Sequence, residues 1–157
     1  MSPTEVVPAR AAERRALALQ DAARLRARVL IDGRLTEAAE GVTFDVENPA
    51  DRSIIGQAAR CGAPEVDRAV QAALRAQPAW AATPARERGR LLARAADRLE
   101  AETDRLAALL CLETGNALAT QARPEVGTAV DTLRLFAGLA GELKGRTIPW
   151  PGGVHCY

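Results

Sequence analysis

Residues 9–28 form the first periodic stretch of the chain, with no glycine or proline and an abundance of alanine and arginine. On a helix, Leu17, Ala18 and Leu25 would lie on one side and form a narrow apolar face. Such a face is typical of a helix at the protein surface. We therefore expect residues 1–28 to form an N-terminal helical extension.

The pattern then changes to short stretches with a period of two. Asp32 and Gly33 lie between two apolar stretches in the segment LIDGRL. Glycine accepts a positive φ without steric cost, and an Asp-Gly pair between such stretches is a strong hairpin signal. A tight antiparallel hairpin is expected here.

A second hairpin is predicted over residues 42–59. Val42, Phe44 and Val46 alternate with polar residues, residues 48–51 (NPAD) supply turn chemistry, and the chain runs back through residues 53–59. Gly56 in the returning strand indicates a bulge or a close backbone approach.

Beyond residue 62 the apolar period becomes 3.6, which predicts helices. Pro64 opens the first of them and Pro78 is expected to end it, leaving Trp80 in the connection. Thr83 and Pro84 are expected to cap and open the second helix.

Two further helices follow. Thr103 is expected to cap a short helix that Gly115 stops. Pro124 opens the last helix and Gly145 ends it, after which residues 149–153 cannot sustain regular structure and residues 155–157 begin a strand. The predicted apolar stripes of the four helices are Val66, Ala69, Val70, Ala73 and Leu74; Leu91, Leu92, Ala95 and Leu99; Leu106, Leu109 and Leu110; and Val126, Val130, Leu133, Ala137 and Ala140.

Composition narrows the functional classes. The 157 residues are 48% hydrophobic, only 3% aromatic and 26% charged, with a net charge of +1. This charge gives no electrostatic reason to expect nucleic acid or an acidic membrane surface as a partner. No apolar run approaches transmembrane length. Glu5, Glu13 and Asp21 interrupt the arginine-rich N-terminal stretch, which argues against a mitochondrial transit peptide.

The three cysteines are Cys61, Cys111 and Cys156, and no CxxC pair is present. Their odd number and wide spacing disfavour a zinc site and a disulfide framework. A reducing, cytoplasmic location fits them best.

Four blocks carry a family resemblance. They are LIDGRL, FDVENPADRSIIG, EVDRAVQAALRAQPAWAATPARERGRLLARAADRLEAETDRLAALLCLETGNAL and TLRLFAGLAGELKGRTIP. In order and spacing they resemble the opening of the NAD(P)-dependent aldehyde dehydrogenase superfamily, over residues 29–157. One departure is Asn116, which stands where the family often has lysine after ETG. That residue is not the chemical centre, so the departure bears on the subfamily.

The resemblance implies an α/β fold with a Rossmann-type cofactor domain. Residues 29–157 would form an incomplete N-terminal part of that domain, mostly α-helical with two small antiparallel hairpins. It also implies oxidation of an aldehyde to a carboxylic acid by NAD or NADP, through a cysteine nucleophile and a glutamate-activated water. The family carries those motifs in later segments. No catalytic, cofactor-binding or metal-binding residue is therefore assigned in this chain.

Several residues invite a functional interpretation that the pattern does not support. His155 and Cys156 are adjacent on an expected strand, so their side chains point to opposite faces. Cys111 adjoins an apolar stripe and is expected to be a small buried residue, and Cys61 is interpreted as a loop residue. Glu113 is interpreted as a surface or packing residue at a helix end.

Two patterns are also given structural interpretations. The run GLAGELKG, with Gly138, Gly141 and Gly145, does not follow a strand and so is not a dinucleotide loop; close helix packing and a C-cap are expected instead. A row of arginines is interspersed with acidic residues and is expected to be a solvated helix surface. Its members are Arg86, Arg88, Arg90, Arg94 and Arg98.

The apolar stripes predict that this chain needs further polypeptide. In the family such helices flank a parallel sheet, and the chain reaches Tyr157 before the main strands of that sheet. We expect the isolated chain to be inactive, unable to bind the cofactor alone, and marginally folded, self-associated or dependent on a partner. The expected partner is the remainder of an aldehyde dehydrogenase subunit, as for a truncated or split gene product, or a homo-oligomer. The alternative is a non-catalytic helical association module, or a remnant, that pairs with a dehydrogenase subunit.

Overall fold

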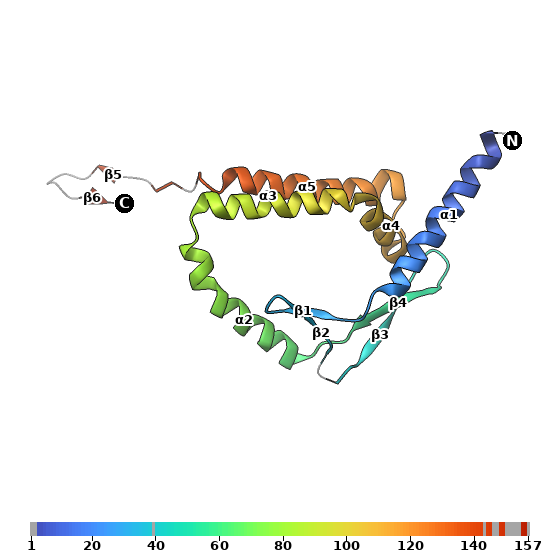
Figure 1. Ribbon diagram of the computed structural model, residues 1–157, viewed down its shortest axis with the longest axis horizontal. Coiled ribbons are helices and arrows are strands. Elements are labelled where there is room, and N and C mark those ends of the chain that lie inside the picture. Colours follow the sequence, from blue (N-terminus) through green and yellow to red (C-terminus); the bar gives the residue numbers. More distant parts are fainter. Residues whose placement is uncertain (1–2, 39, 143, 146–147, 150–154, 157) are drawn as a thin grey trace.

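The computed structural model describes residues 3–38, 40–142, 144–145, 148–149 and 155–156. Helices dominate, and all strands occur in antiparallel pairs (Figure 1). The elements are α1 (Pro3–Arg24), β1 (Val29–Ile31), β2 (Arg34–Thr36), β3 (Thr43–Glu47), β4 (Ile54–Ala59), α2 (Ala63–Ala82), α3 (Ala85–Ala101), α4 (Thr103–Thr114), the π-helical turn η1 (Leu118–Ala122), α5 (Arg123–Leu139), β5 (Ile148–Pro149) and β6 (His155–Cys156).

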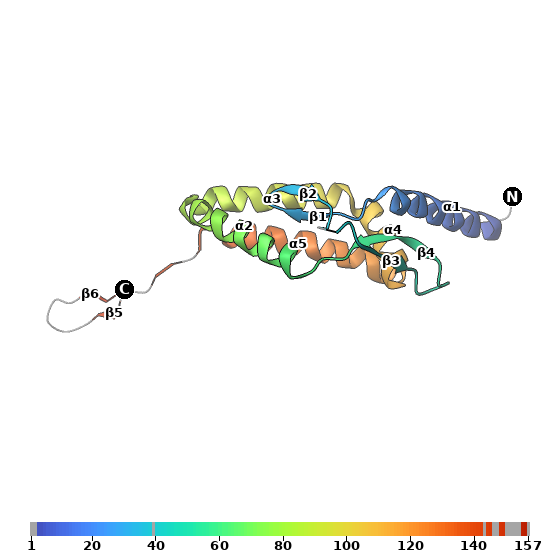
Figure 2. The same ribbon diagram turned by 90° about the horizontal axis from the view of Figure 1, so that it is seen from below.

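These elements form an open ring (Figure 1). Helices α3 and α5 lie side by side and run antiparallel, and the perpendicular view in Figure 2 shows the same pairing. Helix α4 joins this pair to α1, the two N-terminal hairpins follow α1, and α2 leads back to α3. The β5–β6 pair lies away from the helices.

Helix α1 differs from the expected range. It begins at Pro3 and includes Pro8, and it ends at Arg24 instead of residue 28. Pro8 is the sixth residue of α1, so the helix lacks the one backbone hydrogen bond that an amide at this position would donate. Among the residues of its predicted apolar face only Ala18 is buried. The packed face is Ala18 and Ala22, one turn apart, because a helix can approach its neighbours closely along small side chains.

Both predicted N-terminal hairpins are confirmed. Asp32 and Gly33 have positive φ angles of 53° and 71°, and Leu30 pairs with Leu35 across the first hairpin. In the second hairpin Val46 pairs with Gly56 and Glu47 pairs with Ile54, which makes a bulge.

The bulge lies at Ile55, directly before Gly56, as the glycine indicated. Bulges redirect side chains, and Ile55 is buried in a cluster with Ala18 and Leu112. A Cβ atom on Gly56 would lie 3.6 Å from the backbone oxygen of Ala22. The hairpin is thereby held against α1 and α4.

The NPAD turn between β3 and β4 is fixed by its own polar groups. Asn48 is buried, and its Oδ1 accepts a hydrogen bond of 2.9 Å from the Ala50 amide. The Asp51 carboxylate accepts hydrogen bonds from the hydroxyl and amide of Ser53 and pairs with Arg15 of α1. These bonds, with the Arg15 charge, lower the pKa of Asp51 below its ordinary value.

The prediction that Pro78 ends the first long helix is wrong. Helix α2 continues to Ala82 and includes Trp80. Thr83 closes its C-terminus, donating from its amide and its Oγ1 to the Ala79 oxygen at 3.1 and 2.9 Å. The Arg88 guanidinium also donates to the Thr83 oxygen at 2.6 Å. We attribute the extra turn to these bonds, since they satisfy carbonyls at the helix end.

Thr83 was expected to cap the second helix, and this is also wrong. Pro84 occupies the N-cap position and α3 begins at Ala85. The expectation that Thr103 caps the next helix is wrong too, because Glu102 is the N-cap of α4 and Thr103 is its first residue. Gly115 ends α4 as predicted, with a φ of 73°. A Cβ on Gly115 would lie 2.9 Å from Pro49 Cγ, so the end of α4 contacts the NPAD turn closely.

Helix α5 ends at Leu139 and not at Gly145. Gly138 and Gly141 lie around this point, and glycine disfavours helix continuation. The N-terminal end is as expected, because Pro124 occupies its first turn. The expected lack of regular structure is wrong at Pro149, since β5 pairs with β6 through Ile148–Cys156 and Pro149–His155. His155 and Cys156 do form a strand, as predicted.

A close contact between α3 and α5 was missed by the sequence analysis. Gly89 of α3 faces α5, and a Cβ there would lie 2.7 Å from the backbone oxygen of Ala137. Ala96, further along α3, is completely buried, whereas the predicted stripe residue Ala95 is exposed. The packed side of α3 therefore includes small residues that the predicted stripe left out, whereas Leu92 and Leu99 of that stripe are half-buried.

The core is small in volume. No large side chain among the described residues is fully buried, and Ala96, Ala107 and Ala122 are its most completely buried members. The chain exposes 11896 Å² of surface, whereas a compact monomer of 16.7 kDa exposes roughly 7,600 Å². The arrangement thus leaves far more surface in contact with water than an ordinary folded domain.

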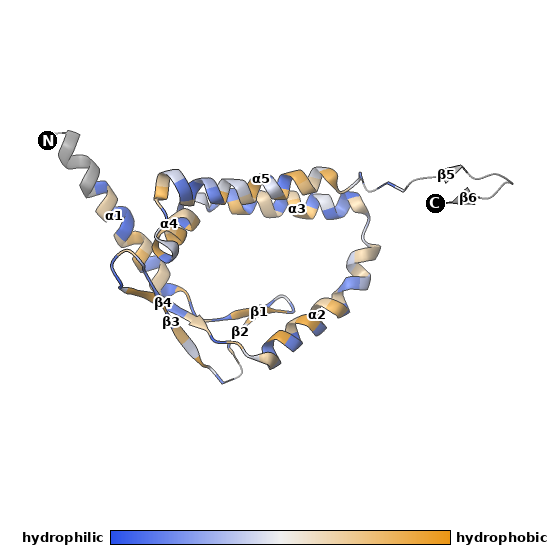
Figure 3. Ribbon diagram, turned by 180° about the vertical axis from the view of Figure 1, so that it is seen from behind, coloured by the Kyte–Doolittle hydropathy of each residue, from blue (hydrophilic) through white to orange (hydrophobic). Residues whose placement is uncertain are grey.

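Much of that surface is apolar. The predicted stripe lies on helix α2, but it is not covered. Its large members Val66, Val70 and Leu74 are 60%, 50% and 59% exposed. On α5, Leu135 and Phe136 are similarly uncovered. Figure 3 shows apolar residues spread over several elements, α2 and the α3–α5 pair among them. These helices are amphipathic, as packed helices are, but no other element of the described chain covers these apolar side chains.

Candidate functional site

Of the residues that invite a nucleophilic role, the structure describes the side chains of Cys61 and Cys111. Cys61 is exposed in the segment before α2. Cys111 is half-buried in α4, less covered than the buried position expected for it. The backbone of Cys156 lies in β6, and its side chain lies outside the described residues, as does that of His155.

The glycine run GLAGELKG is not a phosphate-binding loop in the structure. Gly138 lies within α5, one residue before its end, whereas a dinucleotide-binding loop would follow a strand. The expected close packing is wrong at this glycine, because a Cβ on Gly138 or Gly141 would have no atom within 4 Å. The close helix contact occurs at Gly89 instead.

The arginine row on α3 is a helix surface, as predicted, with one exception. Arg86, Arg90, Arg94 and Arg98 are exposed, and Arg90 forms an ion pair with Glu87. The exception is Arg88, whose half-buried side chain binds the end of α2. The row is therefore a solvated surface that also contributes one helix cap.

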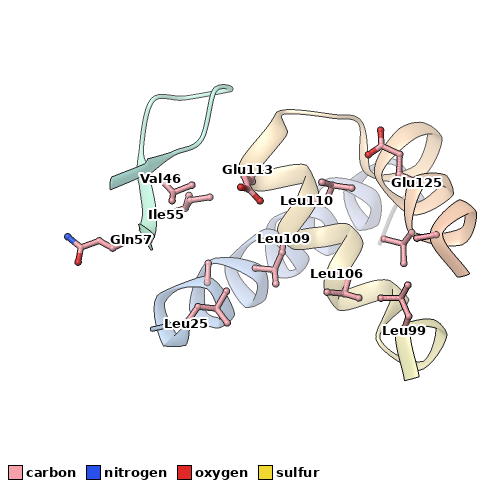
Figure 4. Close-up of a pocket in the computed structure, with 14 residues that line it drawn as sticks. Leu25, Val46, Ile55, Gln57, Leu99, Leu106, Leu109, Leu110, Glu113 and Glu125 are labelled. Atoms are coloured by element: carbon pink, nitrogen blue, oxygen red, sulfur yellow. The ribbon is translucent and has the colours of Figure 1, made fainter. Parts of the chain in front are cut away.

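A concave feature lined mostly by apolar side chains is a groove beside α4, which we call the α4 groove (Figure 4). Its volume is about 600 Å³. Four parts of the chain supply its walls: the end of α1, the β3–β4 hairpin, the α3 end with α4, and the start of α5. The lining residues are Ala22, Leu25, Val46, Ile55, Gly56, Gln57, Leu99, Leu106, Leu109, Leu110, Glu113, Glu125, Val126 and Ala129.

Helix α4 forms the floor of the groove because of its unusual sequence. Residues 106–112 (LAALLCL) are an unbroken apolar run. Ala107 and Leu112 are buried in the two core clusters. Leu106, Leu109 and Leu110 are only half-buried and line the groove. Leu106 and Leu110 also pack against the cluster of Ala107, Ala122 and Val126, so this side of α4 is partly covered.

Two carboxylates lie at one end of the α4 groove. Glu113 is in the last turn of α4 and Glu125 is in the first turn of α5, whereas Leu25 and Leu99 lie toward the opposite end (Figure 4). Glu125 accepts a hydrogen bond of 3.0 Å from Asn116 Nδ2. Glu113 is exposed, as expected, and no ion pair or hydrogen bond of its side chain occurs within the described residues.

The sequence analysis missed this groove as a site. The apolar run over residues 106–112 was the available signal, since a helix that is apolar on all sides is expected to be covered on all sides. Nothing in the sequence pattern brings Gln57 or Glu125 to the same place, because that depends on how the hairpin and α5 meet α4.

The lining of the α4 groove does not fit a dinucleotide. The open groove is apolar apart from its acidic end, and an anionic pyrophosphate requires backbone amides or cationic groups. Within the described part of the chain, no cluster of three or more His, Cys, Asp or Glu side chains could hold a metal. Nor does any helix in that part combine the length and apolarity needed to cross a bilayer.

Comparison with known proteins gives a consistent answer. The model of the aldehyde dehydrogenase family matches residues 35–157. A solved putative aldehyde dehydrogenase from Burkholderia cenocepacia is 44% identical, with a TM-score of 0.79, over 83% of this chain and 27% of that protein. HpcC from Thermus thermophilus is 34% identical, with a TM-score of 0.84, over 88% of this chain and 27% of that protein.

A third similar structure is betaine aldehyde dehydrogenase from Staphylococcus aureus, solved in complex with NAD+. It is 28% identical, with a TM-score of 0.84, over 89% of this chain and 28% of that protein. The chain therefore spans about a quarter of the length of these solved structures. The fold class inferred from the sequence is confirmed, with this segment mostly helical and carrying small antiparallel hairpins. By the match over residues 35–157 and by these similarities, the chain belongs to the aldehyde dehydrogenase family.

Proposed function

We propose that this chain is a structural part of an NAD(P)-dependent oxidoreductase that converts an aldehyde to a carboxylic acid. The family match over residues 35–157 is the observation that carries the proposal. Two similar structures, PnpE and the Staphylococcus aureus enzyme, were solved with NAD, which supports a nicotinamide cofactor. The cofactor is NAD or NADP, and this chain alone does not bind it.

The role of the chain in that enzyme is scaffolding. Among the described residues no nucleophile is paired with a base, and the groove has no cationic or amide-rich wall for a pyrophosphate. In the proposed complete enzyme, other segments supply the cysteine, the water-activating glutamate and the cofactor contacts. Helices α2 to α5 would then cover the sheet that carries them.

Steady-state measurement of nicotinamide reduction tests this role. Purified chain is mixed with an aliphatic or aromatic aldehyde and NAD or NADP, and the absorbance of the reduced cofactor is followed. We expect no turnover above the rate without protein, and no change in intrinsic fluorescence on adding cofactor. Turnover by the purified chain would overturn the proposal.

A second candidate function is a non-catalytic helical module that associates with a dehydrogenase subunit. The exposed faces of α2 and the open α4 groove favour it, since exposed apolar patches mark interaction sites. Inspection of the neighbouring coding sequence separates the two candidates. A frame encoding PWNFP, ELGGK and a cysteine motif supports an enzyme part, and its absence supports the module.

We also propose a reducing, cytoplasmic location. Cys61 and Cys111 are free thiols in the structure, and free thiols persist where the glutathione system keeps them reduced. Fractionation of cells that express the chain tests this, and recovery from an oxidising compartment would contradict it.

A further inference from the structure

We propose that a cavity between α1, the NPAD turn and α4 binds a small apolar monocarboxylate, whose carboxylate accepts hydrogen bonds from Arg14 and Asn48. We call it the Asn48 cavity, and its volume is about 250 Å³. Two observations carry the proposal: a buried side-chain amide with a free donor in the lining, and a positive charge that no lining acid neutralises. The inference goes beyond the proposed function and does not rest on it.

The three elements around the Asn48 cavity are fixed to one another. Helix α1 lies against α4 (Figure 1), and the buried Ala18 of α1 is in one core cluster with Leu112 of α4. Arg15 of α1 pairs with Asp51, which ties the NPAD turn to the same helix. The cavity therefore has walls from three elements that contact one another. The apolar part of its lining includes Ala18, Ala108, Leu112 and Leu118.

The first observation concerns Asn48, which lines the cavity and is only 3% exposed. Its Oδ1 accepts a hydrogen bond of 2.9 Å from the Ala50 amide, and this bond determines which end of the side-chain amide faces the turn. The Asn48 Nδ2 donates no hydrogen bond within the described residues. A donor in such a buried position costs free energy unless an acceptor, from water or a ligand, enters the cavity.

The second observation is the charge of the lining. Arg14 and Arg15 contribute guanidinium groups, and among the described residues no aspartate or glutamate lines the cavity. Arg15 is paired with Asp51, whereas the exposed Arg14 side chain forms no ion pair or hydrogen bond within the described part of the chain. Arg14 is therefore the cation available to a ligand. Since the carbonyl groups at the C-terminal end of α4 favour cations, the anionic group belongs on the α1 side, at Arg14.

These features indicate the class of ligand. Arginine binds a carboxylate through charge-assisted hydrogen bonds, and the alanine and leucine side chains favour an apolar body. A phosphate fits less well, because two donor groups would leave most of its oxygens unpaired. The cavity of about 250 Å³ lies just below the range of roughly 300–1,000 Å³ for drug-sized ligands, so the ligand is small. Benzoate combines one carboxylate with a compact apolar ring and serves as the probe.

Cys111 lines the Asn48 cavity and makes binding measurable. A ligand in the cavity should protect its thiol from alkylation by iodoacetamide, whereas Cys61 is exposed outside the cavity and is the internal control. Mass spectrometry of the purified, reduced full-length chain follows the alkylation of each cysteine at increasing benzoate concentration. We expect saturable protection of Cys111, with a dissociation constant on the order of 0.1–1 mM for a ligand of this size, and no protection of Cys61.

Two further ligands separate the charge from the apolar body. Benzamide keeps the ring and loses the charge, so it should bind roughly two- to fivefold more weakly than benzoate. Acetate keeps the charge and loses the ring, so it should not protect Cys111 in the same concentration range.

Arg14→Gln removes the cation from an exposed position. Benzoate should then bind roughly two- to fivefold more weakly at low salt, with a smaller effect at high salt, as for an exposed ion pair. Arg10→Gln is the matched control, because Arg10 is exposed on the same helix and does not line the cavity. This variant should bind benzoate as the wild type does.

Asn48→Asp tests the buried donor. A carboxylate oxygen can still accept the hydrogen bond from the Ala50 amide and keep the turn, while Nδ2 is replaced by a second acceptor. Benzoate binding should weaken by more than about tenfold, because its carboxylate would lie beside another carboxylate. Circular dichroism checks that each variant keeps the helical content of the wild type, and Arg14→Gln decides the outcome if Asn48→Asp does not fold.

Several results would overturn the inference. They are the absence of Cys111 protection at benzoate concentrations about tenfold above the expected range, equal protection of Cys111 and Cys61, and protection by benzamide as strong as that by benzoate. Unchanged benzoate affinity in Arg14→Gln, or in a folded Asn48→Asp chain, would also overturn it. None of these readouts involves nicotinamide reduction, so a negative result leaves the proposed function untouched.

Discussion

The α3–α5 contact gives the most sharply defined stability prediction, at Gly89. A Cβ at this position would lie 2.7 Å from the Ala137 backbone oxygen and 3.2 Å from the Ala140 Cβ. The nearest atom belongs to a helix backbone, which cannot rotate away as a flexible side chain could. Gly89→Ala must therefore move α3 and α5 apart.

Two opposing effects set the magnitude. The helices must separate by roughly 0.5 Å to restore van der Waals contact, and overpacking of this kind costs about 1–3 kcal/mol. Alanine improves helix propensity over glycine by about 1 kcal/mol. The net expectation is a destabilisation of about 0–2 kcal/mol, because the steric cost of the contact equals or exceeds the gain in helix propensity.

Gly127 in α5 is the matched control, because a Cβ there would have no atom within 4 Å. Gly127→Ala therefore keeps only the propensity gain and should stabilise the chain by about 0.5–1 kcal/mol. The midpoint of urea unfolding, followed by the helical circular dichroism signal, reports both variants. Our account requires the midpoint to fall, or stay unchanged, for Gly89→Ala and to rise for Gly127→Ala. Equal stabilisation by the two substitutions would refute the close contact.

Two further predictions concern the turn beside α4. Gly115→Ala should destabilise the chain by about 1–2 kcal/mol from the left-handed φ alone, and by more because of the 2.9 Å approach to Pro49. Gly41→Ala is the control and should show only the first cost, because Gly41 has a positive φ and open space around it. Equal urea midpoints for the two variants would contradict the contact. Ser53→Ala should raise the pKa of Asp51 toward its ordinary value of 3.8, since it removes the hydroxyl hydrogen bond that is the first cause of the lowering and keeps the amide hydrogen bond. A lowered pKa in the folded state stabilises the fold above pH 3.8, and this contribution is lost as the pH falls through the folded-state pKa. NMR titration of the carboxyl carbon checks the shift, and an unchanged pKa would rule out this cause.

The local features of the fold could be predicted from sequence. Asp32-Gly33 determines its hairpin through φ angles that few other pairs adopt, and Gly115 ends α4 for the same reason. The end of α2 could not be predicted in this way. It depends on bonds from Thr83 and Arg88, so Pro78 has less influence than its local effect suggests.

The candidate site was harder to predict from the sequence than the fold. The predicted absence of catalytic residues came from family motifs, and the packing at Gly89 and the walls of the α4 groove depend on how distant elements meet. The apolar stripe on α2 shows what a sequence pattern can predict and what it cannot. Val66, Val70 and Leu74 have the correct helical spacing, but the pattern alone does not tell which polypeptide covers them.

The central claim is that this chain is a scaffold segment whose apolar faces are completed by further dehydrogenase polypeptide. Thermal melting of the purified chain, followed by circular dichroism, tests it most directly, with and without a co-expressed probe. The probe is the Burkholderia cenocepacia relative from which the part matching this chain has been removed. We predict a broad, low-temperature transition for the chain alone and a sharper, higher one for the complex, because burial of the open faces adds stability. A chain that melts cooperatively as a compact monomer, at a temperature that the probe does not change, would contradict the claim.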